Sequence, residues 1–166
     1  IHNITFVFRS TWKEMEDGIR DDSEAFLDLI TIARKIIERE IINVKDYTDG
    51  GAFVHDAYDK SEDKRIIIID GHYPWESVLG DYPEPLYVVK PDRQNGGKWK
   101  IMAVREDVYT FTNRKSLPKE WAGKRDEEYV KISGVPDAIF CHNKRFIAVA
   151  GSKEGALALA KLAVEA

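Results

Sequence analysis

The sequence predicts a single α+β domain whose mostly antiparallel sheet is flanked by a long N-terminal helix and a C-terminal helix. Three patterns predict this fold. Apolar side chains recur every three or four residues over 23–44, β-branched runs are separated by turn residues, and small apolar residues recur at helical spacing over 153–164. With 166 residues, 43% of them hydrophobic, the chain can bury a core that needs no disulfide or metal.

The predicted elements begin with the helix over 23–44. Asp22 or Ser23 can cap its start, because a side-chain oxygen there accepts a hydrogen bond from a free backbone N–H of the first turn. Two glycines within 49–51 predict a turn after this helix, and 52–58 is predicted to be a short strand.

Two strands and a short helix are predicted next. Residues 66–69 are four isoleucines, which is typical of a strand buried on both faces. Pro74 suits the first turn of a short helix. Residues 86–89 and 98–104 flank Asn95-Gly96-Gly97, and turn residues between two such runs predict a β-hairpin.

The remaining elements complete the fold. One or two short helices are predicted over 118–134, and two further strands over 138–142 and 145–150. Ser152 can cap a final helix over 153–164. Strands joined by tight turns pair antiparallel, so the sheet is expected to be mostly antiparallel.

Charge is unevenly distributed along the chain. The 25 basic and 29 acidic side chains give a formal net charge of −4, yet residues 1–63 hold 8 basic and 15 acidic side chains, and residues 95–125 hold 8 basic and 3 acidic ones. Aromatic residues are interleaved with the basic ones over 95–125. Basic groups attract phosphate and aromatic rings stack on bases, so this segment suits contact with nucleic acid or a nucleotide. The alternative is a solvated sheet face whose aromatic rings point into the core.

The single cysteine, Cys141, excludes an internal disulfide framework and a zinc site built from several cysteines. It suits a reducing compartment, so we expect a cytoplasmic protein. Consecutive strand residues point to opposite faces, so Cys141 and His142 cannot act as a thiolate–imidazole couple; we expect a buried thiol, while His142 can face a cleft. No apolar run approaches the roughly 20 residues of a membrane helix, so no membrane partner is expected.

One stretch is rich in histidine and aspartate, residue types that bind Mn²⁺, Zn²⁺ or non-haem iron. Their spacing matches no known ligand signature, and a turn region rich in Asp and Gly is the alternative interpretation. The residues concerned are His55, Asp56, Asp59, Asp70 and His72.

A second candidate lies directly before the last predicted helix, at Gly151-Ser152-Lys153. Free backbone N–H groups at a helix N-terminus favour an anion such as phosphate. The glycine spacing fits neither a Walker loop nor a dinucleotide fingerprint, and plain helix capping is the alternative.

Several motifs from Pro74 onward resemble those of one known family. They are Pro74-Trp75-Glu76, Arg114-Lys115-Ser116-Leu117-Pro118, Trp121-Ala122-Gly123-Lys124-Arg125-Asp126-Glu127, Ser133-Gly134-Val135-Pro136, Ile139-Phe140-Cys141-His142 and Lys153-Glu154-Gly155-Ala156-Leu157-Ala158. The chain resembles the C-terminal half of the melanocyte proliferating gene (MYG) family of metal-dependent protein hydrolases, which is related to the DHH phosphoesterases. The resemblance covers nearly the whole chain.

This resemblance implies one part of a two-lobed enzyme. Family members act as 3′–5′ exonucleases on RNA, and their N-terminal lobe carries the motifs that bind divalent metal. Residues 1–166 would then be the C-terminal, substrate-side domain, with no catalytic residue, metal ligand or cofactor of their own. Mn²⁺ or Mg²⁺ is expected in an N-terminal lobe outside this chain. The expected partners are RNA or a nucleotide and that lobe; eukaryotic relatives occur in the nucleus and mitochondrion.

In DHH relatives a glycine-rich segment near the last helix approaches the substrate. Here residues 146–151 read FIAVAG, which puts backbone contact at Ala148 and Val149 in doubt and leaves Gly151 to Lys153 as the candidate. Trp121 is expected either to stack on a base or to pack in the core. The expected substrate contacts are Arg114, Trp121, Lys124, Arg125, His142, Gly151, Ser152 and Lys153.

Two other functions remain open on the sequence. The chain could be a non-catalytic interaction or dimerisation module, with 84–104 supplying an edge strand that pairs across a homodimer. Alternatively, it could itself be catalytic through the region of His55 and His72.

Overall fold

The computed structural model describes residues 7–93, 96–107 and 109–166. The chain divides into two compact units, Ile1–Asp46 and Tyr47–Ala166. The helix α3 (Asp22–Lys60) contains the boundary, so each unit holds one part of it. Among the described helices, none combines the length and the apolarity that crossing a membrane requires.

The first unit contains α2 (Trp12–Glu16) and the beginning of α3. Thr11 and Glu14 cap α2 reciprocally, each side chain accepting from the other residue's backbone N–H. Asp21 and Glu24 do the same at the start of α3, one residue before the cap that the sequence predicted. The apolar residues that recur every three or four positions over 23–44 lie in α3, as predicted.

The stretch expected to be a turn and a strand over 49–58 is instead the second part of α3, so that prediction was wrong. The reason lies in packing onto this part of the helix. A Cβ on Gly50 would lie 2.6 Å from Pro74 Cδ, so the glycine lets the Pro74 segment approach the helix closely. Val54, one turn further, is fully buried. Tertiary contact outweighs the turn preference of two glycines.

The second unit is built on a five-stranded sheet, in the order β1 (Ile66–Ile68), β2 (Tyr87–Pro91), β3 (Trp99–Ala103), β5 (Ile147–Ala150) and β4 (Ala138–Cys141). Only the β1–β2 pairing in it is parallel. The α+β class and the mostly antiparallel sheet are therefore confirmed. The β2–β3 hairpin is also as predicted, although Asn95 of its turn lies outside the described residues.

The strand order corrects the proposed dimer contact. Both strands within 84–104, β2 and β3, are interior strands with a partner on each side. Their backbone N–H and C=O groups are already used in ladders, so they cannot pair across a homodimer. The sheet edges are β1 and β4.

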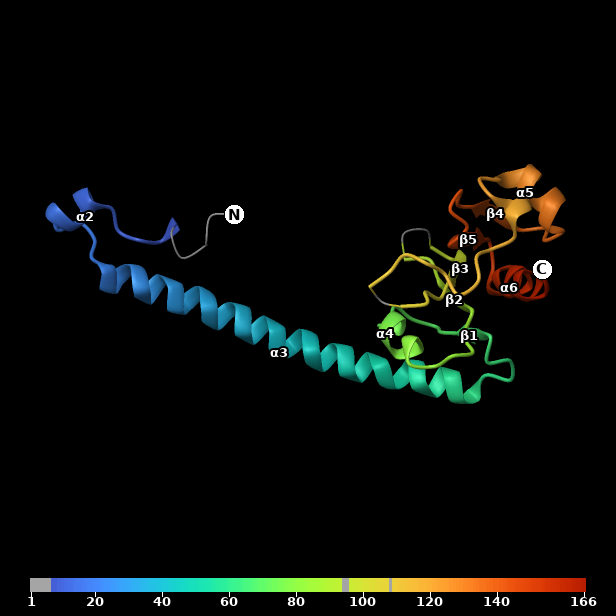
Figure 1. The fold of residues 1–166 in the computed structure, drawn as a ribbon, viewed down its shortest axis with the longest axis horizontal. Coiled ribbons are helices and arrows are strands. Elements are labelled where there is room, and N and C mark those ends of the chain that lie inside the picture. Colours follow the sequence, from blue (N-terminus) through green and yellow to red (C-terminus); the bar gives the residue numbers. More distant parts are fainter. Residues whose placement is uncertain (1–6, 94–95, 108) are drawn as a thin grey trace. The chain divides into compact units, whose positions relative to one another are not determined.

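Helices cover the sheet on both faces, and each face has its own core (Figure 1). On one face, α6 (Lys153–Glu165), α5 (Asp126–Ser133) and the short 3₁₀-helix η1 (Lys119–Trp121) contribute to the larger core. On the other, the end of α3 and α4 (Trp75–Gly80) pack over β1 and β2. The predicted cap at Ser152 is present, and α5 ends at Gly134, which has a left-handed φ of 71° and closes the helical region predicted over 118–134.

A β-bulge interrupts the pairing of β4 with β5. Ala138 pairs with Ala150, but the next pair is Phe140 with Val149, so Ile139 is an extra residue on the β4 side. After the bulge, Cys141 pairs with Ala148 and is fully buried.

Candidate nucleic-acid interface

Strands β3, β5 and β4 present one face to α6 and leave the other partly exposed. Ile101, Ala148 and Cys141 belong to the core under α6 and are fully buried. Their neighbours along each strand point the opposite way, because side chains alternate along a strand, and these neighbours are only half-buried. We call this surface the open sheet face. It consists of Lys100, Met102, Phe140, Ile147 and Val149.

Strand pairing aligns one residue from each of four strands on this side of the sheet. Lys90 of β2 lies opposite Lys100, which lies opposite Val149. Val149 in turn pairs with Phe140, and an isolated bridge joins Phe140 to Arg125. Directly paired residues share a face. We call these five residues the cross-strand row; at about 4.8 Å per strand it spans roughly 19 Å.

One end of the cross-strand row is a chain of ring contacts. The Arg125 guanidinium carbon lies 4.3 Å from the Phe140 ring centroid. Phe140 meets His142 edge-on at 6.2 Å, and His142 meets Phe146 at 4.6 Å between centroids. We call these four residues the ring cluster. Rings can stack on bases while an exposed guanidinium attracts phosphate, so the cluster has the two features of a single-strand binding surface.

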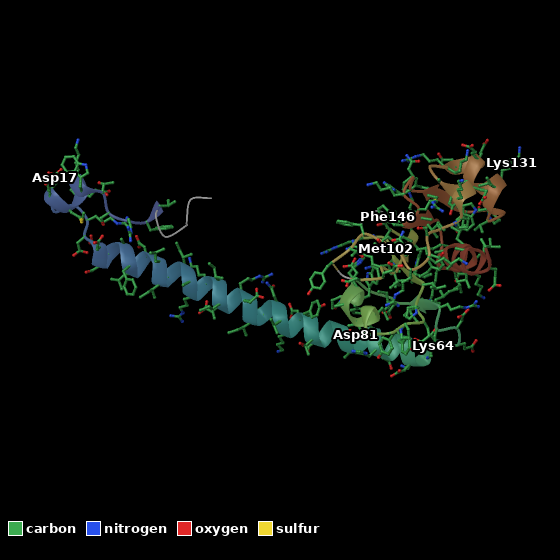
Figure 2. The ribbon with its side chains drawn as sticks, in the orientation of Figure 1. Asp17, Lys64, Asp81, Met102, Lys131 and Phe146 are labelled. Carbon is green, nitrogen blue, oxygen red and sulfur yellow. The ribbon has the colours of Figure 1, made fainter. Side chains whose placement is uncertain are left out.

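Backbone pairing holds the ring cluster in place. Cys141 N donates to Lys124 O at 3.0 Å, and Gly123 N donates to Cys141 O at 3.1 Å, so the segment carrying Arg125 runs beside β4. His142 Nδ1 accepts from Lys144 N at 3.0 Å, which places the proton of the neutral ring on Nε2. Figure 2 shows Phe146 near Met102. The hydrogen bond from Ala103 N to Phe146 O joins the end of β3 to the residue that precedes β5.

The remaining basic and aromatic residues expected in the site lie elsewhere or are already engaged. Lys124 forms an ion pair with Glu128, one turn along α5. Trp121 is 5% exposed and packs edge-on against Tyr129 at 5.5 Å, which matches the core alternative given for it. Its rings offer no open face to a base. Arg125 has no ion pair with Asp126 among the described residues.

Arg114 is a cross-link inside the second unit. Its guanidinium donates to three backbone carbonyls, those of Gly80 at 3.0 Å, Pro85 at 3.2 Å and Tyr82. These carbonyls belong to the last residue of α4 and to the segment between α4 and β2, so the arginine holds this connection in place. Hydrogen bonds from a charged donor are each worth about 1.5–3 kcal/mol, which accounts for the residue without a ligand.

The start of α6 already contains a carboxylate. Ser152 Oγ accepts from Gly155 N at 3.0 Å and donates to Asp137 Oδ2 at 2.5 Å, and Gly151 N donates to Asp137 O at 2.8 Å. A Cβ on Gly155 would lie 2.0 Å from Asp137 Oδ1, so this glycine makes room for the carboxylate. Asp137 thus occupies the position near the helix N-terminus that a bound anion would take.

Lys153 lies on the α6 side of the sheet, with its Nζ 5.3 Å from the Trp99 ring centroid. It also lines a groove of about 570 Å³ beside β1, together with Lys161, Asp56 and Asp70. The groove mixes both signs of charge. Because Trp99 and the cross-strand row point to opposite faces, the structure does not unite Lys153 with Arg125 and His142.

The histidine and aspartate stretch does not form a metal site. Among residues 7–93, 96–107 and 109–166, no three His, Cys, Asp or Glu side chains lie close enough to share an ion. His55 instead contacts the Tyr82 hydroxyl through Nδ1 at 2.8 Å. Burial, and then the nearby charges of Lys90, Arg93 and Lys100, lower the pKa of His72. Cys141 is the buried thiol that the sequence predicted, and burial raises its pKa to about 11, which makes the thiol unreactive.

Sequence reasoning missed Phe140, Phe146 and the pair of lysines at the other end of the cross-strand row. Alternation along β4 could have placed Phe140 with His142. The pairing of Lys90 with Lys100 could have been found by counting outward from the hairpin turn. The link to Arg125 required the fold, because the bridge joins residues from different elements.

The chain matches the model of one protein family, described as Uncharacterised protein family (UPF0160), over residues 1–164. It is 34% identical to the MYG1 protein of Schizosaccharomyces pombe, over 64% of this chain and 34% of that protein. It is 29% identical to the MYG1 protein of Dictyostelium discoideum, over 89% and 45%. Identity to the human MYG1 exonuclease is 36%, over 58% and 27%. The matches span less than half the length of these relatives. No solved structure matches the chain.

Proposed function

The chain belongs to the MYG1 family (UPF0160), and on this premise we propose that it is the substrate-contacting part of a MYG1-type 3′–5′ RNA exonuclease. Its human relative is named an exonuclease. In this proposal the chain binds the RNA or nucleotide and closes over it, while another part of the protein carries the hydrolytic centre.

One observation carries the proposal. The ring cluster combines an exposed guanidinium over Phe140 with the adjoining rings of His142 and Phe146. Stacking tolerates any base, and a cation beside the stacked ring can meet the phosphate that follows it. Such contacts bind a single strand independently of its sequence, as an exonuclease requires.

The metal ions belong, in this proposal, to protein outside the chain. Two-ion hydrolysis needs several converging carboxylates and histidines. The part of the chain that the structure describes brings no three such ligands together, so its residues do not fit a two-ion site. We therefore propose that Mn²⁺ or Mg²⁺ binds in the part of MYG1-type proteins that lies outside this chain. Hydrolysis of the kind that DHH phosphoesterases carry out would take place in that same part.

Salt-dependent RNA binding tests the proposal. The full chain should bind a single-stranded RNA oligonucleotide, with affinity falling as salt rises. Arg125→Met should reduce the slope of log K against log salt by about 0.7, the value of one phosphate contact on a single strand. Phe140→Leu should cost about 1–3 kcal/mol, the value of one stacked base. Fluorescence anisotropy at several salt concentrations measures both effects.

A matched variant controls for loss of positive charge. Lys131→Met removes one exposed charge from α5, on the side away from Phe146 in Figure 2, and should leave the affinity unchanged. If the chain shows no RNA affinity even at low salt, or if all three variants bind as the original chain does, the proposal fails.

A second candidate function is a protein-interaction module, which exposed apolar side chains in the first unit favour. Phe26, Ile37 and Ile41 are 62%, 60% and 64% exposed although they lie on one side of α3. We propose that the partner is the part of a MYG1-type protein that lies outside this chain, with a second copy of the chain in a homodimer as the alternative. Sedimentation velocity distinguishes them: a concentration-dependent dimer supports the homodimer, and a monomer supports the partner within the longer protein.

A further inference from the structure

Lys90 is an unusual residue for the interior of a sheet. It lies on β2, is 8% exposed, and has its Nζ 6.0 Å from the Trp75 ring centroid. Within the described residues its ammonium has no ion pair. A buried charge without a counter-ion is costly, so such a lysine calls for an explanation beyond packing.

A second lysine stands directly opposite it. Lys100 pairs with Lys90 in the β2–β3 ladder, and side chains so paired start about 5 Å apart on one face. Like charges in this position repel. Asp92 lies 3.5 Å from Lys100 Nζ, which leaves the positive charge of Lys90 uncompensated by an ion pair. Burial and then Lys100 lower the pKa of Lys90, while Glu76 opposes the shift.

The surroundings are positive as well. Arg93 follows β2, and His72 precedes α4; both are exposed, and His72 lies near Arg93 and the two lysines. Lys100 keeps 19% of its side chain exposed. The opposing charges are Asp92 and Glu76. Two ammonium groups on one sheet face, with a histidine and an arginine beside them, match the charge of a phosphate group better than that of a single carboxylate.

We propose that Lys90 and Lys100 form a binding subsite for a phosphate group, either the phosphate of a mononucleotide or a backbone phosphate of RNA. The subsite lies at the opposite end of the cross-strand row from Arg125. It rests on the proposed function only for the source of the phosphate, since a free phosphate ion has the same chemistry. A bound phosphate supplies the missing counter-charge of Lys90.

Thermal unfolding of the full chain with sodium phosphate tests the subsite. The melting temperature of the original chain should rise with phosphate at constant ionic strength, because a ligand that binds only the folded state stabilises it. Lys90→Met and Lys100→Met should abolish this rise. The control variant Lys131→Met, which also loses one charge, should keep it. In chloride alone, Lys90→Met should melt at the same or a higher temperature than the original chain, since it removes an unpaired buried charge.

The source of the phosphate is distinguished by two further ligands. If adenosine monophosphate produces the rise at lower concentration than phosphate does, a nucleotide is the ligand. If Lys100→Met instead weakens RNA binding at least fivefold while the monophosphate has no effect beyond that of phosphate, the ligand is the RNA backbone.

The inference is overturned if phosphate shifts all variants equally, which would be a general salt effect, or shifts none. Should Lys90→Met fail to fold, Lys100→Met at the half-buried position decides the question. The test is separable from that of the proposed function, because phosphate should still stabilise Arg125→Met even if the chain binds no RNA.

Discussion

Arg114 and Arg125 are eleven positions apart in one basic segment, and nothing local distinguishes them. In the structure, Arg114 donates to three carbonyls inside the fold, whereas Arg125 lies over an aromatic ring at the surface. Residue type and charge therefore place both arginines in one candidate segment, but do not tell which of the two guanidinium groups is available to a ligand. That depends on whether backbone carbonyls converge around the guanidinium, and the convergence is produced by residues about thirty positions away.

Cys141 gives the residue-scale prediction. Burial raises its pKa from 9.0 to about 11, so the unfolded chain releases the thiol proton at lower pH than the folded chain does. The stability that this group contributes is fully present below pH 9 and is lost as pH rises through 11. The difference in unfolding free energy between the original chain and Cys141→Ala should therefore shrink by on the order of 2 kcal/mol over this range.

Urea unfolding of both proteins at pH 8 and pH 11 measures that difference. Other groups that titrate in this range cancel, because both proteins contain them. A difference that does not change with pH would contradict the buried thiol, as would rapid reaction of the folded chain with a thiol reagent at pH 8.

At the scale of elements, the sequence predicted most helices and strands because their signals are local. Alternation identified β3, and Ser152 marked the start of α6. The error at 49–58 has a physical cause: two adjacent glycines favour a turn, but contacts of Gly50 and Val54 with distant segments keep the chain helical. The capping carboxylate of Asp137 could not be predicted, since it comes from the loop before β4.

The close approach of Asp137 to Gly155 gives the element-scale prediction. Gly155→Ala should destabilise the chain by about 2 kcal/mol or more, because the new Cβ would overlap the carboxylate and disturb the helix cap. Gly151→Ala is the matched control: its Cβ would lie 3.4 Å from Asp137 Cβ, an ordinary contact, and it should be nearly neutral. Chemical denaturation measures both.

The cause can be isolated by removing the carboxylate. In an Asp137→Ala background, Gly155→Ala should be neutral or stabilising by up to about 1 kcal/mol, since alanine favours the helix more than glycine does. If Gly155→Ala costs the same in both backgrounds, Asp137 does not fill the N-terminus of α6.

At the scale of the molecule, both cores consist of residues from Val54 onward. The sequence predicted the α+β class and the two flanking helices, but not the strand order. Placing β5 between β3 and β4 requires pairing between residues almost fifty positions apart. Short-range patterns contain no information on such a contact, and for the same reason they could not predict the cross-strand row.

The distribution of the cores predicts that residues 47–166 fold without the first unit. A chain of this length should unfold in one cooperative thermal transition, with a melting temperature within about 5 °C of that of the full chain, equivalent to about 1 kcal/mol. Circular dichroism in the near ultraviolet reports on the buried Trp75 and Trp121. A broad, non-cooperative transition would show that the second unit depends on the first.

The extra residue at Ile139 has a consequence for how this surface can change. If Ile139 paired with β5 instead of bulging, the register set by Ala138 and Ala150 would pair Phe140 with Ala148 and Cys141 with Ile147. The phenylalanine would then enter the core and the thiol would face solvent. Deletion of Ile139 would not exchange the two faces, because Phe140 would then follow Ala138 directly and keep its pairing with Val149. The open sheet face and the core thus correspond to two alternative registers of β4, and the bulge selects between them.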